Sequence, residues 1–247
     1  MCKVMGIVNV TPDSFSDGGQ FFKPEEAIRR AKNLIADGAD IIDLGGESTR
    51  PGATPIGWEE EWARIEPVLC QLATRNSQLA SRISVDTYHP ETAAKAIAAG
   101  AHIINCVYAE PIPEMLKLLE GNNVELVVPY RKEGDFACQR PRSEGAAGTI
   151  WGRLYLDPMI GFGTTREEDV ELLKSIPELA KKGRVLIGAS RKRIVKKLVG
   201  EKSAVGKNIG GNVAIAVWAA MQGASVVRVH DVKETVQALR VVEQLRG

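Results

Sequence analysis

The sequence predicts a single α/β domain of the (β/α)₈, or TIM, barrel type, and three observations lead to that prediction. The chain has 247 residues, a length that suits one eight-fold barrel with a large buried core. Short apolar runs alternate with amphipathic stretches from residue 3 to residue 245. Eight such runs separated by helical patterns favour a closed parallel barrel over an open, doubly wound sheet. We therefore expect residues 1–247 to form one domain.

The predicted strands are brief apolar runs bounded by glycine, proline or charged residues, as expected for strands that are buried on both faces. They lie at residues 3–10, 39–44, 82–86, 101–106, 124–128, 152–157, 184–188 and 225–229. Several of the helical patterns begin with proline and end on glycine, as in the stretch from Pro24 to Gly38. The predicted helices lie at residues 24–37, 58–74, 90–98, 113–119, 167–181, 209–222 and 233–245.

The fifth connection breaks this rhythm. Residues 130–151 contain Pro141, Gly145 and Gly148 and leave no room for an amphipathic helix of normal length. We expect a shortened unit that has either lost its outer helix or kept a single turn near Ala146 and Ala147. One interpretation is a surface loop. The alternative is that missing helical cover exposes the barrel wall, which a partner subunit would then hide.

Composition excludes several classes of partner. The net charge is +1 and the basic residues are spread along the chain, which argues against a nucleic-acid-binding protein. The four cysteines have no paired metal-ligand spacing and are typical of reduced thiols in a cytosolic protein. No targeting pattern or membrane-spanning apolar run is present in the sequence. We therefore expect a cytoplasmic protein that binds no membrane.

Polar residues gather where the predicted strands end, which is where barrels of this type place their active sites. Asp86, Asn105, Asp157 and Lys192 would converge there and could bind the donor and acceptor edge of a flat heterocycle. A carboxylate buried in this way needs a donor-rich partner. Asn9, Arg50, Arg228 and His230 are suited to a phosphate group. The residues alone therefore indicate a heterocycle with a phosphate-type leaving group and leave the heterocycle open.

Two long motifs resemble signatures of the dihydropteroate synthase family. Residues 5–19 read MGIVNVTPDSFSDGG and residues 43–52 read DLGGESTRPG, and Ser190-Arg191-Lys192 and Arg228-Val229-His230-Asp231 follow in the family's order. The resemblance covers nearly the whole chain. It implies a transferase of folate biosynthesis that joins 6-hydroxymethyl-7,8-dihydropterin pyrophosphate to p-aminobenzoate and releases pyrophosphate, with Mg²⁺ as cofactor. In this family the leaving group departs first, and the aniline nitrogen then attacks a cationic pterin.

The resemblance also implies a role for individual residues. The expected catalytic residues are Asp13, Arg50, Asp86 and Lys192, and the expected pterin contacts are Asp86, Asn105, Asp157, Lys192 and Arg228. Asn9 would help to hold Mg²⁺ and the pyrophosphate, with Arg228 and His230 beside the same anion. Two mobile loops and an aromatic wall would shape the p-aminobenzoate site, through Phe15, Thr49, Arg50, Pro51 and Phe162. Asp43 and Glu47 are interpreted as braces of the second loop, and His89 and His102 as ordinary surface or helix-end residues.

The sequence departs from the family pattern around the pocket. Cys106 stands where the family usually has aspartate, Pro129-Tyr130 replace Met-His, Met159 replaces a glycine and Thr164 replaces a lysine. Three hypotheses remain open: a working synthase, a divergent or engineered relative that uses another acceptor or is inactive, and a protein that only binds pterin. A folate-dependent methyltransferase on the same kind of barrel is a further alternative, and it would be expected to lack the Ser-Thr-Arg-Pro and Ser-Arg-Lys motifs.

The stretch at residues 209–222 is apolar enough to be either core or subunit interface, through Val213, Ile215, Val217 and Trp218. The family tends to pair through its later helices, so we predict a homodimer.

Overall fold

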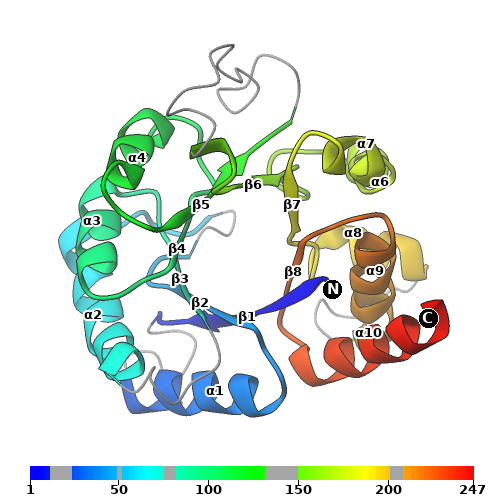
Figure 1. Cartoon of the computed structure of the whole chain (residues 1–247), viewed down its shortest axis with the longest axis horizontal. Helices are drawn as coiled ribbons and strands as arrows, with labels where there is room; N and C mark the ends of the chain where they lie inside the picture. The colour runs from blue at the N-terminus through cyan, green and yellow to red at the C-terminus, as the bar shows by residue number, and fades with distance from the viewer. Residues whose placement is uncertain (12–23, 49–51, 75–81, 132–149, 201–207) are drawn as a thin grey trace.

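The structure is a computed structural model that describes residues 1–11, 24–48, 52–74, 82–131, 150–200 and 208–247. Eight parallel strands, hydrogen-bonded in chain order with β8 returning to β1, close a barrel inside a ring of helices (Figure 1). The strands are β1 (Lys3–Asn9), β2 (Ile41–Gly45), β3 (Arg82–Asp86), β4 (Ile103–Asn105), β5 (Glu125–Pro129), β6 (Leu154–Asp157), β7 (Arg184–Ile187) and β8 (Val226–Val229). The prediction of a (β/α)₈ barrel is confirmed, and each strand overlaps its predicted run.

The helices agree with the sequence patterns except after β6 and β7. They are α1 (Pro24–Ala36), α2 (Trp58–Thr74), α3 (Pro90–Ala98), α4 (Ile112–Leu119), α6 (Arg166–Lys174), α7 (Ile176–Ala180), α8 (Arg193–Val199), α9 (Ile209–Met221) and α10 (Val232–Arg246). The single helix predicted at residues 167–181 is wrong, because Pro177 belongs to the first turn of a new helix after Ser175. The short helix α8 has no counterpart in the prediction, since seven residues give too weak a periodic signal.

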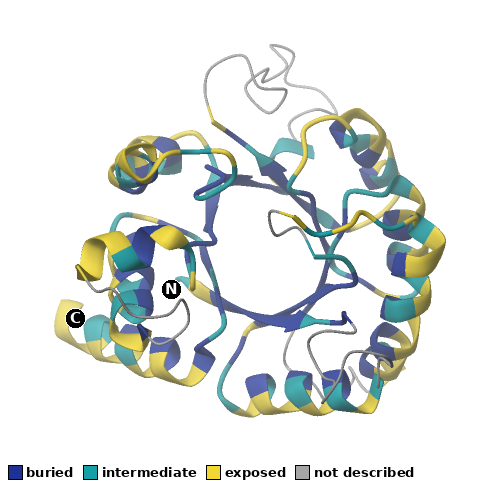
Figure 2. Cartoon of the chain, turned by 180° about the vertical axis from the view of Figure 1, so that it is seen from behind, coloured by how far each residue is buried: buried dark blue, intermediate teal, exposed yellow. Residues whose placement is uncertain are grey.

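The fifth connection lies mostly outside the described residues, so the expected loop or single turn near Ala146 and Ala147 stays a prediction. The neighbouring wall of the barrel is described. Its outward-facing side chains on β5 and β6 are at most 5% exposed: Leu126, Val128, Leu154 and Leu156. The alternative of an exposed wall awaiting a partner subunit is therefore wrong for these two strands. Figure 2 shows the same contrast between buried strands and the exposed outer faces of the helices.

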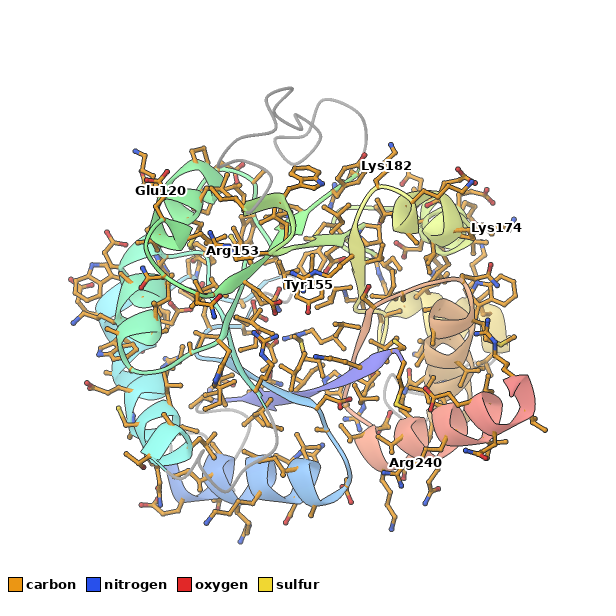
Figure 3. The ribbon with its side chains drawn as sticks, in the orientation of Figure 1. Glu120, Arg153, Tyr155, Lys174, Lys182 and Arg240 are labelled. Carbon is orange, nitrogen blue, oxygen red and sulfur yellow. The ribbon has the colours of Figure 1, made fainter. Side chains whose placement is uncertain are left out.

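The barrel interior consists of three layers along its axis. A buried apolar layer fills the middle, with one side chain from every strand except β3: Met5, Ile41, Ile103, Val127, Tyr155, Leu186 and Val226. At the N-terminal end of the strands, Glu125 accepts hydrogen bonds from Arg82 Nη1 (2.5 Å) and Arg184 Nη1 (2.6 Å). Tyr155, which Figure 3 shows within the ring of strands, lies beside this charged group. A polar layer at the C-terminal ends of the strands forms the opposite side.

Candidate active site

The predicted site residues that the structure describes all lie at the C-terminal end of the barrel. Asn9, Asp86, Asn105 and Asp157 end their strands, Arg228 lies in β8, and Lys192 and His230 follow β7 and β8. Parallel strands bring these positions together at one edge of the barrel. Asp13, Phe15, Thr49, Arg50 and Pro51 lie outside the described residues, so their loop roles stay predictions.

Arg228 lies at the centre of this C-terminal end of the barrel, called the mouth below. Its side chain connects β8 with β2 and β3. Its Nε donates to Asp43 Oδ2 at 2.6 Å, and its Nη2 donates to Asp86 Oδ2 at 2.7 Å. Asn105 Nδ2 donates to the same Asp43 oxygen at 3.2 Å. The interpretation of Asp43 as a loop brace is wrong, because its fully buried carboxylate holds Arg228 and Asn105. The strand's two-residue periodicity is the signal for this, since Asp43 shares the inward face of β2 with Ile41.

Burial and charge act against each other in this network. Burial raises the pKa of Asp86 to about 7, although the guanidinium of Arg228 opposes the shift. Burial acts to lower the pKa of Arg228, but the carboxylates of Asp43 and Asp86 outweigh it and raise that pKa. Arg228 is therefore always charged here, whereas the Asp86 carboxyl group titrates near neutral pH.

Two acceptor atoms of the network are left for a ligand. Among the described residues, Asp43 Oδ1 and Asn105 Oδ1 are buried and have no hydrogen-bond partner, as does Ser84 Oγ on the neighbouring strand. An unsatisfied buried polar group costs about 1–3 kcal/mol. A ligand that presents N–H groups to this edge would remove that cost, which is the property expected of an amino-substituted heterocycle.

Lys192 and Asp157 also lie at this end of the barrel and act on each other's pKa electrostatically. Burial lowers the pKa of Lys192 to about 8, with Asp157 acting in the opposite direction. Burial raises the pKa of Asp157, and Lys192 counters it. Lys192 Nζ donates to the Ile160 carbonyl oxygen at 2.6 Å and lies 4.3 Å from the centre of the Phe162 ring. The predicted aromatic wall and the predicted pterin contact are therefore in direct contact with each other.

The position of the His230 ring is fixed by its neighbours. Ser190 Oγ lies 3.2 Å from His230 Nδ1 and accepts a hydrogen bond from the His230 backbone N–H at 3.2 Å. Arg30 Nη2 donates to the His230 carbonyl oxygen at 2.9 Å. Asn9 is half-buried at the end of β1, beside Gly45 in the strand register. No group of three His, Cys, Asp or Glu side chains able to hold a metal ion occurs in the described parts of the chain.

The positions that depart from the family pattern differ in what they do. Cys106 is 1% exposed, and its thiol lies 3.3 Å from the Tyr108 carbonyl oxygen. Burial raises the pKa of this thiol to about 12, so it is a neutral packing group. Tyr130 is buried and accepts a hydrogen bond from Lys182 Nζ at 2.9 Å. Met159 has a φ of 62°, a left-handed conformation that glycine adopts without strain.

Glu47 and His89 contact each other beside β3. Tyr88 donates a hydrogen bond to Glu47 Oε1 at 2.8 Å, and His89 Nε2 lies 3.4 Å from Glu47 Oε2. Glu47 is thus held from the connection between β3 and α3, and the loop that it is predicted to brace lies outside the described residues. His89 is the residue before α3, as expected of a helix-end residue, but it also makes this contact.

Comparisons with known proteins agree over nearly the whole chain. The family model described as pterin binding enzyme matches residues 5–146 and 145–230. A dihydropteroate synthase of Staphylococcus haemolyticus is 37% identical, over 99% of this chain and 95% of its own. That of Escherichia coli K12 is 41% identical, over 97% and 90%. The solved structure of Xanthomonas albilineans dihydropteroate synthase with 4-aminobenzoic acid is 40% identical, with a TM-score of 0.85 over 100% of this chain and 93% of that one.

Proposed function

This chain belongs to the dihydropteroate synthase family, and from that membership we infer its reaction and propose the residues that carry it out. It is a transferase of folate biosynthesis that condenses 6-hydroxymethyl-7,8-dihydropterin pyrophosphate with p-aminobenzoate to give dihydropteroate and pyrophosphate. One observation supports the assignment above all. Asp86 and Asn105 are joined through Arg228 and Asp43 in one buried network, in which Asp43 Oδ1 and Asn105 Oδ1 have no hydrogen-bond partner among the described residues.

We propose that Asp86, Asn105, Asp157 and Lys192 bind the polar edge of the pterin. Asn105 Oδ1 would accept ring N–H groups, and the carboxylates of Asp86 and Asp157 would lie beside the ring. When pyrophosphate leaves, positive charge develops on the pterin, and fixed carboxylates stabilise that charge without reorganising. Arg228 keeps Asp86 in place through the 2.7 Å hydrogen bond.

The pyrophosphate end is assigned to Asn9, Arg228 and His230. The residues fit a bound Mg²⁺, because the ion commonly keeps several waters and takes further ligands from substrate phosphates, so one protein oxygen at Asn9 is enough. When bound, Mg²⁺ neutralises charge on the departing pyrophosphate. Arg228 and His230 would bind the same anion, with Ser190 and Arg30 fixing the histidine. Asp13, Phe15, Thr49, Arg50, Pro51 and Phe162 are proposed to enclose p-aminobenzoate.

A homodimer and a cytoplasmic location complete the proposal. Helix α9 buries Ile215 and Ala219 but exposes Trp218 (48%) and Met221 (49%), so it packs on the barrel and also presents an apolar outer face. Leu198 and Val199 of α8 are exposed next to it, which makes this surface suited to a second copy of the chain. In the described residues no helix is long and apolar enough to cross a membrane.

The relatives described above all have the synthase activity in their names, which favours the synthase over the folate-dependent methyltransferase. The alternative of an inactive or divergent relative remains for experiment. This alternative is motivated by the altered positions around the site, and two of them, Cys106 and Tyr130, are buried side chains with hydrogen-bond partners of their own.

The test is release of pyrophosphate from 6-hydroxymethyl-7,8-dihydropterin pyrophosphate with Mg²⁺ and p-aminobenzoate. We expect turnover that depends on p-aminobenzoate and falls at least about 100-fold in Asp86→Asn and Lys192→Ala. Glu171→Gln is the matched control, since this carboxylate is 71% exposed on α6 and should leave turnover unchanged. If pterin binds calorimetrically but no p-aminobenzoate-dependent turnover occurs, the synthase assignment fails and another acceptor or a binding role takes its place.

A further inference from the structure

Lys192 depends on the turn that follows β6. The turn, residues 159–164, supplies the Ile160 carbonyl oxygen that accepts the lysine's hydrogen bond and the Phe162 ring beside its amine. Gly161 in the same turn has a φ of +80°, and a Cβ there would lie 3.0 Å from Lys192 Cδ. The stem of the lysine thus runs against a backbone that has no room for a side chain. Any change in the shape of this turn would move the amine.

Asp169 of helix α6 fixes that shape. Its Oδ1 accepts hydrogen bonds from the Gly161 backbone N–H at 2.7 Å and from Thr164 Oγ1 at 2.6 Å. Thr164 Oγ1 also accepts a hydrogen bond from the Gly161 backbone N–H at 3.1 Å. Thr164, where the family usually has lysine, is therefore part of an internal brace of the turn. One carboxylate oxygen holds the turn at its centre and at its end.

The helix itself does not require this carboxylate. The first turn of α6 is closed by Thr165 and Glu168, whose side chains and backbones form a complete capping box. Asp169 is 1% exposed, and burying an ionised carboxylate is costly unless donors meet it. A carboxylate at this position is thus better explained by the turn that it holds than by the stability of α6.

The charge of Asp169 also reaches Lys192. Four charged groups surround the amine: Asp157 on β6, Asp86 on β3 and Asp169 on α6 favour its protonated form, whereas Arg228 on β8 disfavours it. Burial is the larger effect and favours the neutral amine. Asp169 therefore helps to keep the lysine protonated at neutral pH, although it does not touch it.

We propose that Asp169 is a positioning residue of the active site, which holds the turn at residues 159–164 through Gly161 and Thr164 and thereby fixes the place and charge of Lys192. The inference deepens the proposed function, because it rests on Lys192 being a pterin contact. Asp169 touches neither substrate. It acts by holding the turn and by the electrostatic effect of its charge on Lys192.

The kinetic test compares two substitutions of Asp169. Asp169→Asn keeps an acceptor oxygen for the turn and removes the charge, so turnover at pH 7 should stay within about threefold of wild type. In Asp169→Asn, the fall of kcat/KM at high pH, where Lys192 loses its proton, should move to lower pH by on the order of half a unit. Asp169→Ala removes the brace as well, and we expect KM for the pterin substrate to rise about tenfold. Thr164→Val should raise KM for the pterin substrate less than Asp169→Ala does. Thr164→Ser should leave KM near the wild-type value, because serine keeps the hydroxyl group.

Glu168→Gln is the control for a simple effect on helix α6, because it weakens the capping box of the same helix and leaves the turn's brace in place. It should lower thermal stability without moving the pH profile. An Asp169→Asn profile that coincides with wild type, or a Glu168→Gln profile that shifts equally, would show that Asp169 serves the helix alone.

A measurement without substrates separates this inference from the proposed reaction. In protein labelled with [¹³Cε]lysine, the Lys192 resonance, assigned by its loss in Lys192→Arg, should titrate near pH 8 and move to lower pH in Asp169→Asn. If the wild-type enzyme shows no turnover but this shift occurs, the reaction assignment fails and the positioning role stands. An unchanged titration contradicts the positioning role whatever the turnover.

Discussion

Two charged residues of the barrel mouth have pKa values that burial moves toward each other. The carboxyl group of Asp86 has a pKa of about 7, above its ordinary value, and the amine of Lys192 has one of about 8, below its ordinary value. Asp86 is thus largely ionised above pH 7, and Lys192 is largely protonated below pH 8. Both groups are predominantly charged, with opposite signs, in the interval between these values, and Arg228 is charged throughout.

This arrangement predicts a bell-shaped pH profile of kcat/KM for the pterin substrate, with its maximum between about pH 7 and 8. At pH values below the optimum, kcat/KM should fall because Asp86 gains a proton. At pH values above it, kcat/KM should fall because Lys192 loses one. Lys192→Arg, measured with a stopped pyrophosphate assay from pH 5 to 10, should keep residual turnover and lose the basic limb, because an arginine stays charged over this range.

Lys174→Arg is the matched control, because Lys174 is 63% exposed and pairs with Glu171 at the surface. Its profile should coincide with that of the wild type. A basic limb that persists unchanged in Lys192→Arg would assign that limb to another group and contradict the role given to Lys192.

Helices α8 and α9, on the later side of the barrel, approach each other closely. Helix α9 packs on α8 through Gly211, where an added Cβ would lie 2.5 Å from Val199 and 2.9 Å from Val195. Helix α8 begins directly after Lys192. Gly211 of α9 therefore sets the distance between α9 and α8, the helix whose N-terminal end carries Lys192. Gly210, the residue before Gly211, has open space around it.

Substitution at these two glycines should have opposite effects on the free energy of unfolding. Gly211→Ala forces α8 and α9 apart and should destabilise the protein by about 1–3 kcal/mol. Gly210→Ala meets no atom and should stabilise it by about 0.5–1 kcal/mol, because alanine loses less backbone entropy in a helix. Urea denaturation followed by circular dichroism measures both. Equal effects of the two changes would contradict the close approach of α8 and α9.

At the scale of the whole molecule, a single barrel leaves an apolar surface on α8 and α9 exposed. Its largest side chains are Leu198, Ile209, Trp218 and Met221, each more than 40% exposed. Scattered exposed apolar residues are ordinary, but a group on adjoining helices is typical of an interface.

We expect the protein to be a dimer and Trp218→Glu to be a monomer, because a buried unpaired carboxylate would be too costly at the interface. Static light scattering at several concentrations measures this. Tyr108→Glu, which changes a comparably exposed aromatic on the connection between β4 and α4, should remain dimeric. A wild-type mass equal to one chain, 26.8 kDa, would refute the homodimer.

Most of the barrel, and the gathering of polar residues at the C-terminal ends of its strands, could be predicted from the sequence, for physical reasons that also explain the omissions. Buried parallel strands produce continuous apolar runs, and the residues that end them, such as Asp86 and Asp157, share one edge of the barrel. Asp43 was misinterpreted because it stands in the same motif as the second loop. The role of Asp169 was missed because its contact with Gly161 depends on the geometry of a turn, which hydrophobic periodicity does not encode.

The apolar layer in the middle of the barrel lies between two groups of charged side chains and keeps them apart in space. Glu125 and its two arginines lie on one side of it, and the Asp43, Asp86 and Arg228 network lies on the other. A buried apolar layer leaves no space for water between the two groups, but it does not screen their charges, because a low dielectric strengthens electrostatic interactions. The two ends of the barrel are built from different side chains, so we expect changes at the Glu125 end to alter stability and changes at the Asp43, Asp86 and Arg228 end to alter substrate specificity.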